Sequence, residues 1–276
     1  MGRIRNTFEL AKLSWGVLKK DRELLVIPVL SFLVSAALLI PLMFVVFATA
    51  STESGGVEEA SANPAMLLVG IVAALGLSVI SVFFNGALVA GAHERLAGGD
   101  PTVGSAIRKA FSRIPGLVPW AILTGTVGMI LRALRDRAGW LGQFVISMVG
   151  MAWEVATFLV VPAIVIDDKG AIEGLKTSGS LLKSTWGENL AARVGFGLLG
   201  FVAMLPAVLL IAVFGSLGGV GLIVGIAVGV VWIAVVVVVM TALNAVFQAA
   251  LYLYATSGMA PSGFEGSSLG ESFSRR

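Results

Sequence analysis

Residues 140–166 read WLGQFVISMVGMAWEVATFLVVPAIVI, and they are followed by DDKG at 167–170 and AIEGLKTSGSLLKSTW at 171–186. An apolar run longer than about 18 residues is typical of a membrane-spanning helix. The acidic and glycine residues end that run, and the last segment places Lys176 and Lys183 between apolar residues at helical spacing. This part of the chain therefore predicts a membrane span, a turn and a basic amphipathic helix.

The composition of the whole chain agrees with a membrane protein. Of its 276 residues, 57% are hydrophobic and 13% are charged, and the mean hydropathy is +0.97. Soluble domains are roughly 45–50% apolar and about 25% charged. The net charge of +3 does not indicate nucleic-acid binding, because the basic residues flank the apolar runs. The absence of cysteine excludes disulfides and thiolate metal sites.

The apolar runs predict an all-α bundle of six transmembrane helices. We expect the spans at about residues 24–48, 65–92, 117–131, 140–166, 194–214 and 222–254. Residues 1–258 then form a single transmembrane domain, and the Ser- and Gly-rich residues 259–276 form a disordered tail. The first apolar run is too long for a signal-peptide core, so we expect it to be retained.

The distribution of Lys and Arg predicts the orientation in the membrane. Basic residues gather before the first span and in the second and fourth loops, whereas the first and fifth loops carry none. The positive-inside rule therefore places both termini in the cytoplasm. Arg132, Arg135 and Arg137 disagree with this arrangement, because they follow the third span and would lie outside.

Three basic amphipathic helices are predicted at the inner surface, over residues 3–20, about 103–114 and 171–186. Tryptophan flanked by Lys and Arg suits the headgroup boundary of a bilayer, where anionic lipid attracts the cations. For the first helix, simple packing on the bundle remains an equal alternative. The side chains expected at the membrane surface are Lys12, Trp15, Lys19, Arg108, Lys109, Lys176, Lys183 and Trp186.

The pieces of the chain also suggest a threefold internal repeat of basic amphipathic helix, span and span. The second span of each unit carries a polar residue some 14–16 positions before a closing glycine, at Asn85, Glu154 and Asn244. Membrane bundles are often built from repeats. Because low-complexity apolar sequence aligns easily with itself, chance similarity remains the alternative.

Glu154 is an acid deep within a long apolar run, and an ionisable residue at the bilayer centre costs on the order of 2.5–3.5 kcal/mol. Two interpretations are open: a site for a proton or cation, or a protonated side chain that bonds across helices and fixes their packing. Asn85, Asn244 and Gln248 are candidate partners. Asn244, Gln248 and Tyr252 share one helix face, which suits interhelical hydrogen bonds or a polar pathway.

Other motifs indicate packing rather than chemistry. Gly221, Gly225 and Gly229 recur at every fourth position, which allows another helix to approach closely within the monomer or between protomers. His93 is followed by Glu94, but no second histidine completes a zinc motif, and no phosphate-binding loop is present. We therefore expect no enzyme activity, no metal and no cofactor.

One block of residues resembles a family of bacterial multi-helix membrane proteins of unassigned function. The residues that carry the likeness are Trp153, Glu154, Phe158, Val161, Pro162, Gly170, Glu173, Leu175, Lys176, Ser178, Leu182, Lys183 and Trp186. More remotely, the block is similar to the membrane domain of some bacterial glycerophosphodiester phosphodiesterases. The resemblance implies a six-helix module in the bacterial plasma membrane and transfers no catalytic residue.

Two functions from different classes follow from these observations. The first is a non-catalytic membrane protein that organises lipid or a protein partner at the inner surface, with anionic inner-leaflet lipids as partners and a homo-oligomer as a further option. The second is a small transporter or channel that uses Glu154 with Asn85 and Asn244.

Overall fold

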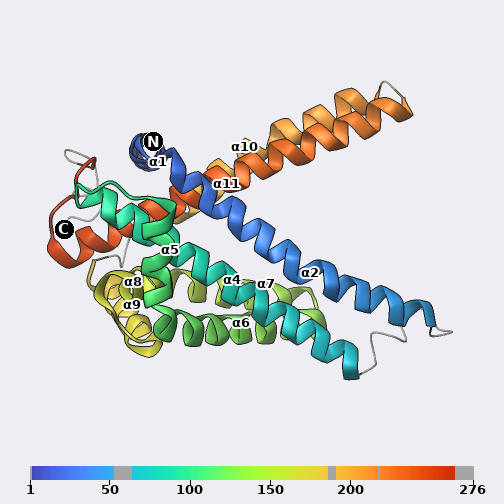
Figure 1. Cartoon of the computed structure of the whole chain (residues 1–276), viewed down its shortest axis with the longest axis horizontal. Helices are drawn as coiled ribbons and strands as arrows, with labels where there is room; N and C mark the ends of the chain where they lie inside the picture. Colours follow the sequence, from blue (N-terminus) through green and yellow to red (C-terminus); the bar gives the residue numbers. More distant parts are fainter. Residues whose placement is uncertain (1, 53–63, 186–190, 217, 265–276) are drawn as a thin grey trace. The chain divides into compact units, whose positions relative to one another are not determined.

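The computed structural model describes residues 2–52, 64–185, 191–216 and 218–264 (Figure 1), without the side chains of residues 2–10, 50–52, 182–185 and 191–199. Over this part of the chain the structure is helical and contains no strand, so the all-helical prediction is confirmed. The elements are α1 (Gly2–Lys20), η1 (Arg22–Leu25), α2 (Val26–Thr52), α4 (Pro64–Leu96), α5 (Val103–Ser112), α6 (Ile114–Arg137), α7 (Trp140–Ala156), α8 (Val160–Asp167), α9 (Ala171–Thr185), α10 (Ala191–Gly215) and α11 (Gly219–Ser257).

Five stretches of the described residues are long and apolar enough to cross a membrane. They are Arg22–Thr49, Pro64–Leu96, Ile114–Arg137, Trp140–Asp167 and Gly219–Ser257. Their outward surfaces are rich in exposed Leu, Val, Ile and Phe, as expected for helices in contact with lipid. The predicted fifth span, residues 194–214, falls in α10, and the part of α10 whose side chains are described, Gly200–Gly215, is an apolar helix. The count of six spans therefore stays a prediction.

The chain divides into two compact units, which we describe separately. The first unit comprises residues 1–28, 91–103 and 180–276, and the second comprises residues 29–90 and 104–179. In the first unit α1 packs against η1, α10 and α11. The largest fully buried side chains there are Leu18, Leu24, Ile27, Phe247, Leu251, Tyr252 and Phe264. The core of this unit therefore lies where the C-terminal half of α11 packs against α1 and η1.

The outer part of the first unit is a hairpin of α10 and α11, which lie side by side (Figure 1). Gly225 and Gly229 are buried. A Cβ at Gly225 would lie 2.8 Å from Phe214 of α10, and a Cβ at Gly229 would lie 2.8 Å from Ile211 of α10. The small side of α11 thus faces its neighbour within the same chain, which permits close helix packing. Gly221, one turn earlier, is half-buried.

In the second unit α6 packs against α7 and α8. The Trp120 and Trp153 rings are stacked with centroids 6.1 Å apart, and the Trp153 indole N–H donates to Thr124 Oγ1 at 3.4 Å. Nearer the polar end, a Cβ at Gly116 would lie 2.7 Å from Ile164 of α8. Glycine is required there because α6 and α8 approach so closely.

The predicted span over residues 140–166 is present, but it is not one continuous helix. It is divided between α7 and α8, with a turn at residues 157–159. Pro162 lies in the first turn of α8 and favours this break. Proline has no N–H to donate to the carbonyl of Phe158, and its ring clashes with that carbonyl in a regular helix.

Ser178 of α9 satisfies the backbone groups that the break exposes. Its hydroxyl accepts a hydrogen bond from the Leu159 N–H at 3.1 Å and donates one to the Ala156 carbonyl at 2.6 Å. The Ser178 side chain is fully buried. Because unpaired backbone groups in an apolar medium cost several kcal/mol, this one hydroxyl makes the interrupted span tolerable.

The order of the elements follows the threefold pattern of surface helix, span and span: α1, α2 and α4; α5, α6 and α7–α8; α9, α10 and α11. Each second span ends at a residue with positive φ, at Gly98, Asp168 and Gly258 respectively. These residues follow Asn85, Glu154 and Asn244 by 13, 14 and 14 positions. The polar residue and the left-handed end of the span therefore keep nearly constant spacing in all three segments.

Candidate functional site

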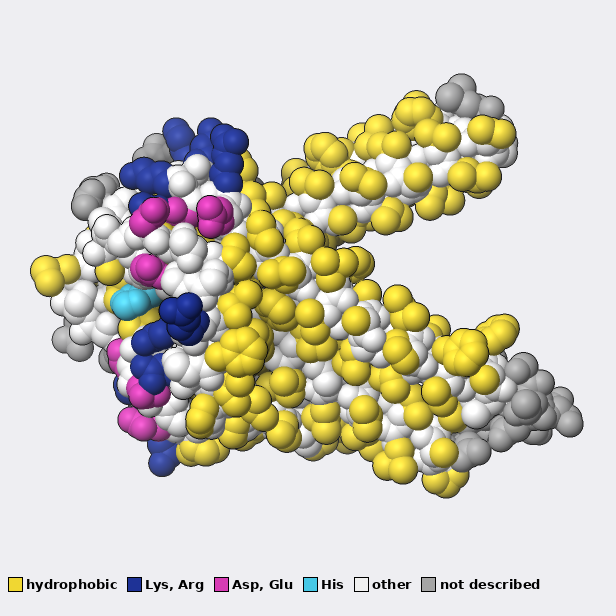
Figure 2. All heavy atoms as spheres, viewed as in Figure 1, with side chains coloured by type: hydrophobic (Ala, Val, Ile, Leu, Met, Phe, Trp, Pro, Cys, Tyr) yellow, Lys and Arg dark blue, Asp and Glu magenta, His cyan; other side chains and the backbone are white. Residues whose placement is uncertain are grey.

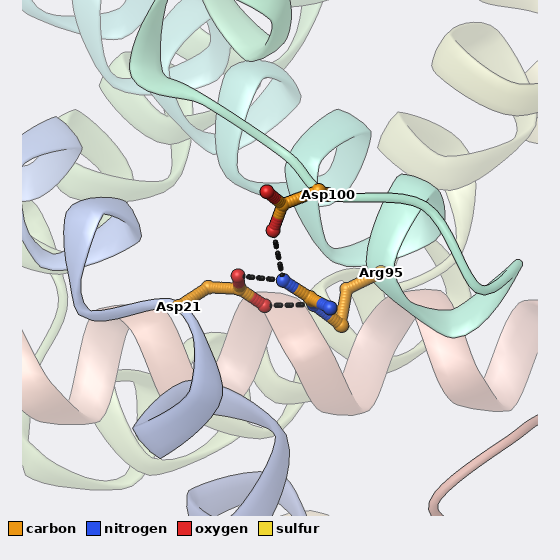
Figure 3. A network of polar contacts seen from close by, with 3 residues as sticks. All are labelled: Asp21, Arg95 and Asp100. Carbon is orange, nitrogen blue, oxygen red and sulfur yellow. Dashed lines mark hydrogen bonds and ion pairs between the residues drawn. The ribbon is translucent and has the colours of Figure 1, made fainter.

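An ion-pair network ties together the polar end of the first unit (Figure 3). Arg95, in the last turn of α4, donates from Nε and Nη2 to the two carboxylate oxygens of Asp21, which lies between α1 and η1. Nη2 also donates to Asp100 Oδ1 at 2.6 Å. The Asp21 side chain is 4% exposed and that of Arg95 is 22% exposed, whereas Asp100 is 92% exposed. The Asp21 contact is therefore the structural one, since exposed pairs contribute little.

The second unit has an ion pair in the corresponding place with the charges reversed. Arg113, between α5 and α6, pairs through Nη1 with Asp168 at the left-handed end of α8. In both units a residue at the junction of surface helix and first span is joined to the end of the second span. The pairing of Arg95 with Asp21 and that of Arg113 with Asp168 could not be predicted from the sequence, because the partners are far apart along the chain.

A pocket of about 450 Å³ lies beside the Asp21–Arg95 pair in the first unit. We call it the basic pocket, and its lining residues are Lys12, Leu13, Gly16, Val17, Lys20, Arg95, Ser262 and Gly263. Lys12, Gly16 and Lys20 recur at every fourth position of α1, so all three lie on one face of the helix. Two cations thus flank a glycine on the same helix face.

The segment after α11 forms the remaining wall of the basic pocket. Ser262 Oγ donates to the Leu96 carbonyl at 2.5 Å, and the Phe264 side chain is fully buried. Gly263 has a φ of +87° and its Cβ position lies 3.2 Å from Val17 Cγ2, so a side chain there would be strained. Residues 259–264 belong to the stretch expected to be a disordered tail; residues 265–276 lie outside the described part.

Helix α1 presents different chemistry on its two sides. Ser14, Val17 and Leu18 are buried, which fixes the helix on its unit. Trp15 is 38% exposed, and Lys19 Nζ lies 6.0 Å above its ring. The helix therefore packs on the bundle along one side and exposes an aromatic–cation pair along the other, which suits a water–lipid boundary.

The other predicted surface cations are exposed where their side chains are described. Arg108 and Lys109 lie on α5, which buries Ala106 and Ala110, and Lys176 lies on α9, which buries Gly174 and Ser178. The side chain of Lys183 and the whole of Trp186 lie outside the described residues. On the face drawn in Figure 2, apolar side chains cover the outer lengths of the helices, and the charged side chains lie away from these lengths.

The intramembrane polar candidates are divided between the two units. Glu154 is exposed on α7, one turn before the break, and Asn85 is half-buried on α4; both belong to the second unit. Asn244, Gln248 and Tyr252 belong to the first unit and share a face of α11, on which Gln248 and Tyr252 are buried. Within the described residues no group of three or more His, Cys, Asp or Glu side chains is placed to hold a metal ion.

Comparison with known proteins identifies a family. None of the curated proteins matches the chain. The model of a family described as "Family of unknown function (DUF6159)" matches residues 65–264, from the start of α4 to the buried Phe264. The match includes Arg95, Ser262 and Gly263 of the basic pocket and excludes α1. The remoter similarity to phosphodiesterase membrane domains has no counterpart here and stays a prediction. Since the match covers well over half of its length, the chain belongs to the DUF6159 family of unknown function.

Proposed function

We propose that this protein is a non-catalytic, multi-pass protein of the bacterial plasma membrane that organises anionic lipid, or a protein partner, at the inner membrane surface. The observation that carries the proposal is common to α1, α5 and α9. Each helix buries one side within its own unit and exposes Lys or Arg elsewhere. Such helices are fixed to the bundle, so their cations remain available to groups outside the protein.

The electrostatics of a bacterial inner leaflet support this proposal. Anionic lipid attracts Lys and Arg near the surface by about 1 kcal/mol per residue, and the attraction decays within a Debye length. The exposed Trp15–Lys19 pair adds an aromatic ring of the kind that resides among headgroups. The positive-inside rule places these helices in the cytoplasm together with both termini, on a bundle of six spans.

The test is the lipid composition around the protein after extraction from its own membrane in polymer-bounded discs. In the test variant, Lys12, Lys19, Arg108, Lys109, Lys176 and Lys183 are all replaced by glutamine. We expect this variant to carry a smaller fraction of anionic lipid than the wild type. A control variant replaces Arg132, Arg135 and Arg137, which follow the predicted third span and are predicted to lie outside. An unchanged anionic fraction, and unchanged recovery of any co-extracted protein, would refute the proposal.

A small transporter or channel is the second candidate, and one observation favours it. The span that contains Glu154 is broken at residues 157–159, directly after the acid. Discontinuous membrane helices frequently form the binding sites of transporters. An ionisable residue inside a membrane is itself an indication of a site for a proton or an ion.

Proton flux into dye-loaded proteoliposomes tests this second candidate. Glu154→Gln should abolish a pH-dependent flux, because the amide cannot take up and release a proton. Glu173→Gln is the matched control, since Glu173 is an exposed acid on the surface helix α9. Flux that is equal in the wild type and in Glu154→Gln would count against transport through this site.

A further inference from the structure

We infer that the basic pocket binds the phosphate group of a single anionic phospholipid. The inference rests on the proposed function, because it takes the inner surface to be the side that meets anionic lipid, and it names one site and its ligand. Lys12, Lys20 and Arg95 supply three cationic side chains to one pocket. Phosphate is the lipid group that such side chains bind by charge and by hydrogen bonds.

The spacing on α1 suits a small anion held between two lysines. Lys12 and Lys20 are eight residues apart, which corresponds to about 12 Å along a helix axis. Each ammonium is carried on a flexible four-carbon stem, so both can reach the gap above Gly16. A Cβ at Gly16 would have no described atom within 4 Å. The helix surface between the lysines is therefore open enough for a ligand.

Arg95 has a different role from the lysines. Its charge is balanced by Asp21 and Asp100, and the described contacts use its Nε and Nη2 donors. The guanidinium has five N–H donors in a fixed plane, and the two on Nη1 are not used by these contacts. The carboxylates thus hold the guanidinium in place, so that Arg95 offers directed hydrogen bonds while Lys12 and Lys20 provide the net charge.

The size and walls of the pocket favour a lipid over free phosphate. Ligand pockets range over about 300–1,000 Å³, and the basic pocket, at about 450 Å³, is larger than a lone phosphate ion needs. Leu13 and Val17 supply apolar wall on the α1 side. The adjoining wall, Ser262 and Gly263, is followed directly by the buried Phe264. A glycerol backbone attached to the phosphate would fill space that an isolated ion leaves empty.

The test is native mass spectrometry of the full chain in mild detergent, titrated with short-chain phosphatidylglycerol. We expect one lipid to bind more tightly than any further lipid. Lys12→Gln with Lys20→Gln should weaken this first binding event about 30-fold, because each cation contributes about 1 kcal/mol. Gly16→Leu should weaken it by a similar factor while both charges remain, because the new side chain fills the open space above the helix.

The matched control is Arg132→Gln with Arg135→Gln, which removes the same charge from exposed positions on α6 and should leave the first binding event unchanged. Separate titrations with inorganic phosphate and with phosphatidylcholine identify the source of the recognised group. Equal affinity in both pocket variants and the wild type would overturn the inference. Inorganic phosphate that binds as tightly as the lipid would overturn the assignment to a lipid.

The experiments distinguish a wrong pocket assignment from a wrong proposed function. If the pocket variants bind the first lipid normally, while the polymer discs still show anionic lipid that depends on the surface cations, only the pocket assignment is wrong. If the six-residue variant keeps the anionic lipid of the wild type, the proposed function is wrong whatever the titration shows.

Discussion

Replacing either partner of the Asp21–Arg95 pair should destabilise the protein, and the two replacements should differ. Asp21 is almost fully buried and receives two hydrogen bonds from Arg95. Arg95→Met would leave this buried carboxylate without its cation. Asp21→Asn keeps one acceptor oxygen, and it leaves Arg95 in contact with Asp100. We therefore expect Arg95→Met to be the more damaging change.

The magnitudes follow from burial. Breaking a buried ion pair by removing one partner costs about 3–5 kcal/mol. We place Arg95→Met at about 3–4 kcal/mol, because Asp21 has little access to water. Asp21→Asn should cost about 2 kcal/mol, since Arg95 is partly solvated and keeps a second carboxylate. Asp100→Asn should cost less than about 0.5 kcal/mol, as expected for an exposed partner.

Charge exchange provides the sharper test of the same pair. The second unit places Arg113 before its first span and Asp168 at the end of its second, which is the reverse order of Asp21 and Arg95. Asp21→Arg combined with Arg95→Asp should therefore recover about half of the stability lost in Arg95→Met. The free energy of unfolding is measured by circular dichroism in mixed micelles titrated with a denaturing detergent. A double variant no more stable than Arg95→Met, or an undamaged Arg95→Met, would refute this reasoning.

Three further changes test the packing. Ser178→Ala should lower the free energy of unfolding by about 2 kcal/mol, because the buried Leu159 N–H loses its acceptor, and it should speed hydrogen exchange at that amide. Gly225→Ala should lower the free energy of unfolding by about 1–3 kcal/mol in the same titration, because its Cβ would lie 2.8 Å from Phe214 of α10. Gly219→Ala is the control: its Cβ would meet no atom within 4 Å, so it should not destabilise the protein. Phe264→Ala should release the segment after α11, so limited proteolysis should cleave residues 259–264 faster than in the wild type. An unchanged cleavage rate would contradict the role of Phe264 as an anchor.

The helices themselves were predictable from the sequence because each is a long apolar or amphipathic run. The break in the fourth span was not predicted, since residues 140–166 form one long and mainly apolar run. The local signal was Pro162, whose effect falls on the carbonyl four residues earlier. The residue that compensates, Ser178, lies on another helix, 19 residues beyond the amide that it serves. Only the tertiary structure reveals that contact.

The candidate site was predictable in part. Helical periodicity identified Lys12 and Lys19 as surface cations, and these side chains are exposed. The basic pocket could not be predicted, because its walls come from α1, the end of α4 and the segment after α11. Asp21 and Arg95 are 74 residues apart in sequence, and no local pattern connects them. Residues 259–276 are Ser- and Gly-rich, and this composition does not indicate that the Phe264 side chain is fully buried.

All that is proposed about lipid requires α1, α5 and α9 to share the cytoplasmic surface, and the absence of cysteine makes this directly measurable. Single cysteines are introduced at the exposed positions Lys19, Lys109, Lys176 and Arg137 and treated with a membrane-impermeant maleimide. The first three should react only in inside-out vesicles, and position 137 only in right-side-out spheroplasts. Reaction of position 109 or 176 from the side opposite to position 19 would contradict the account.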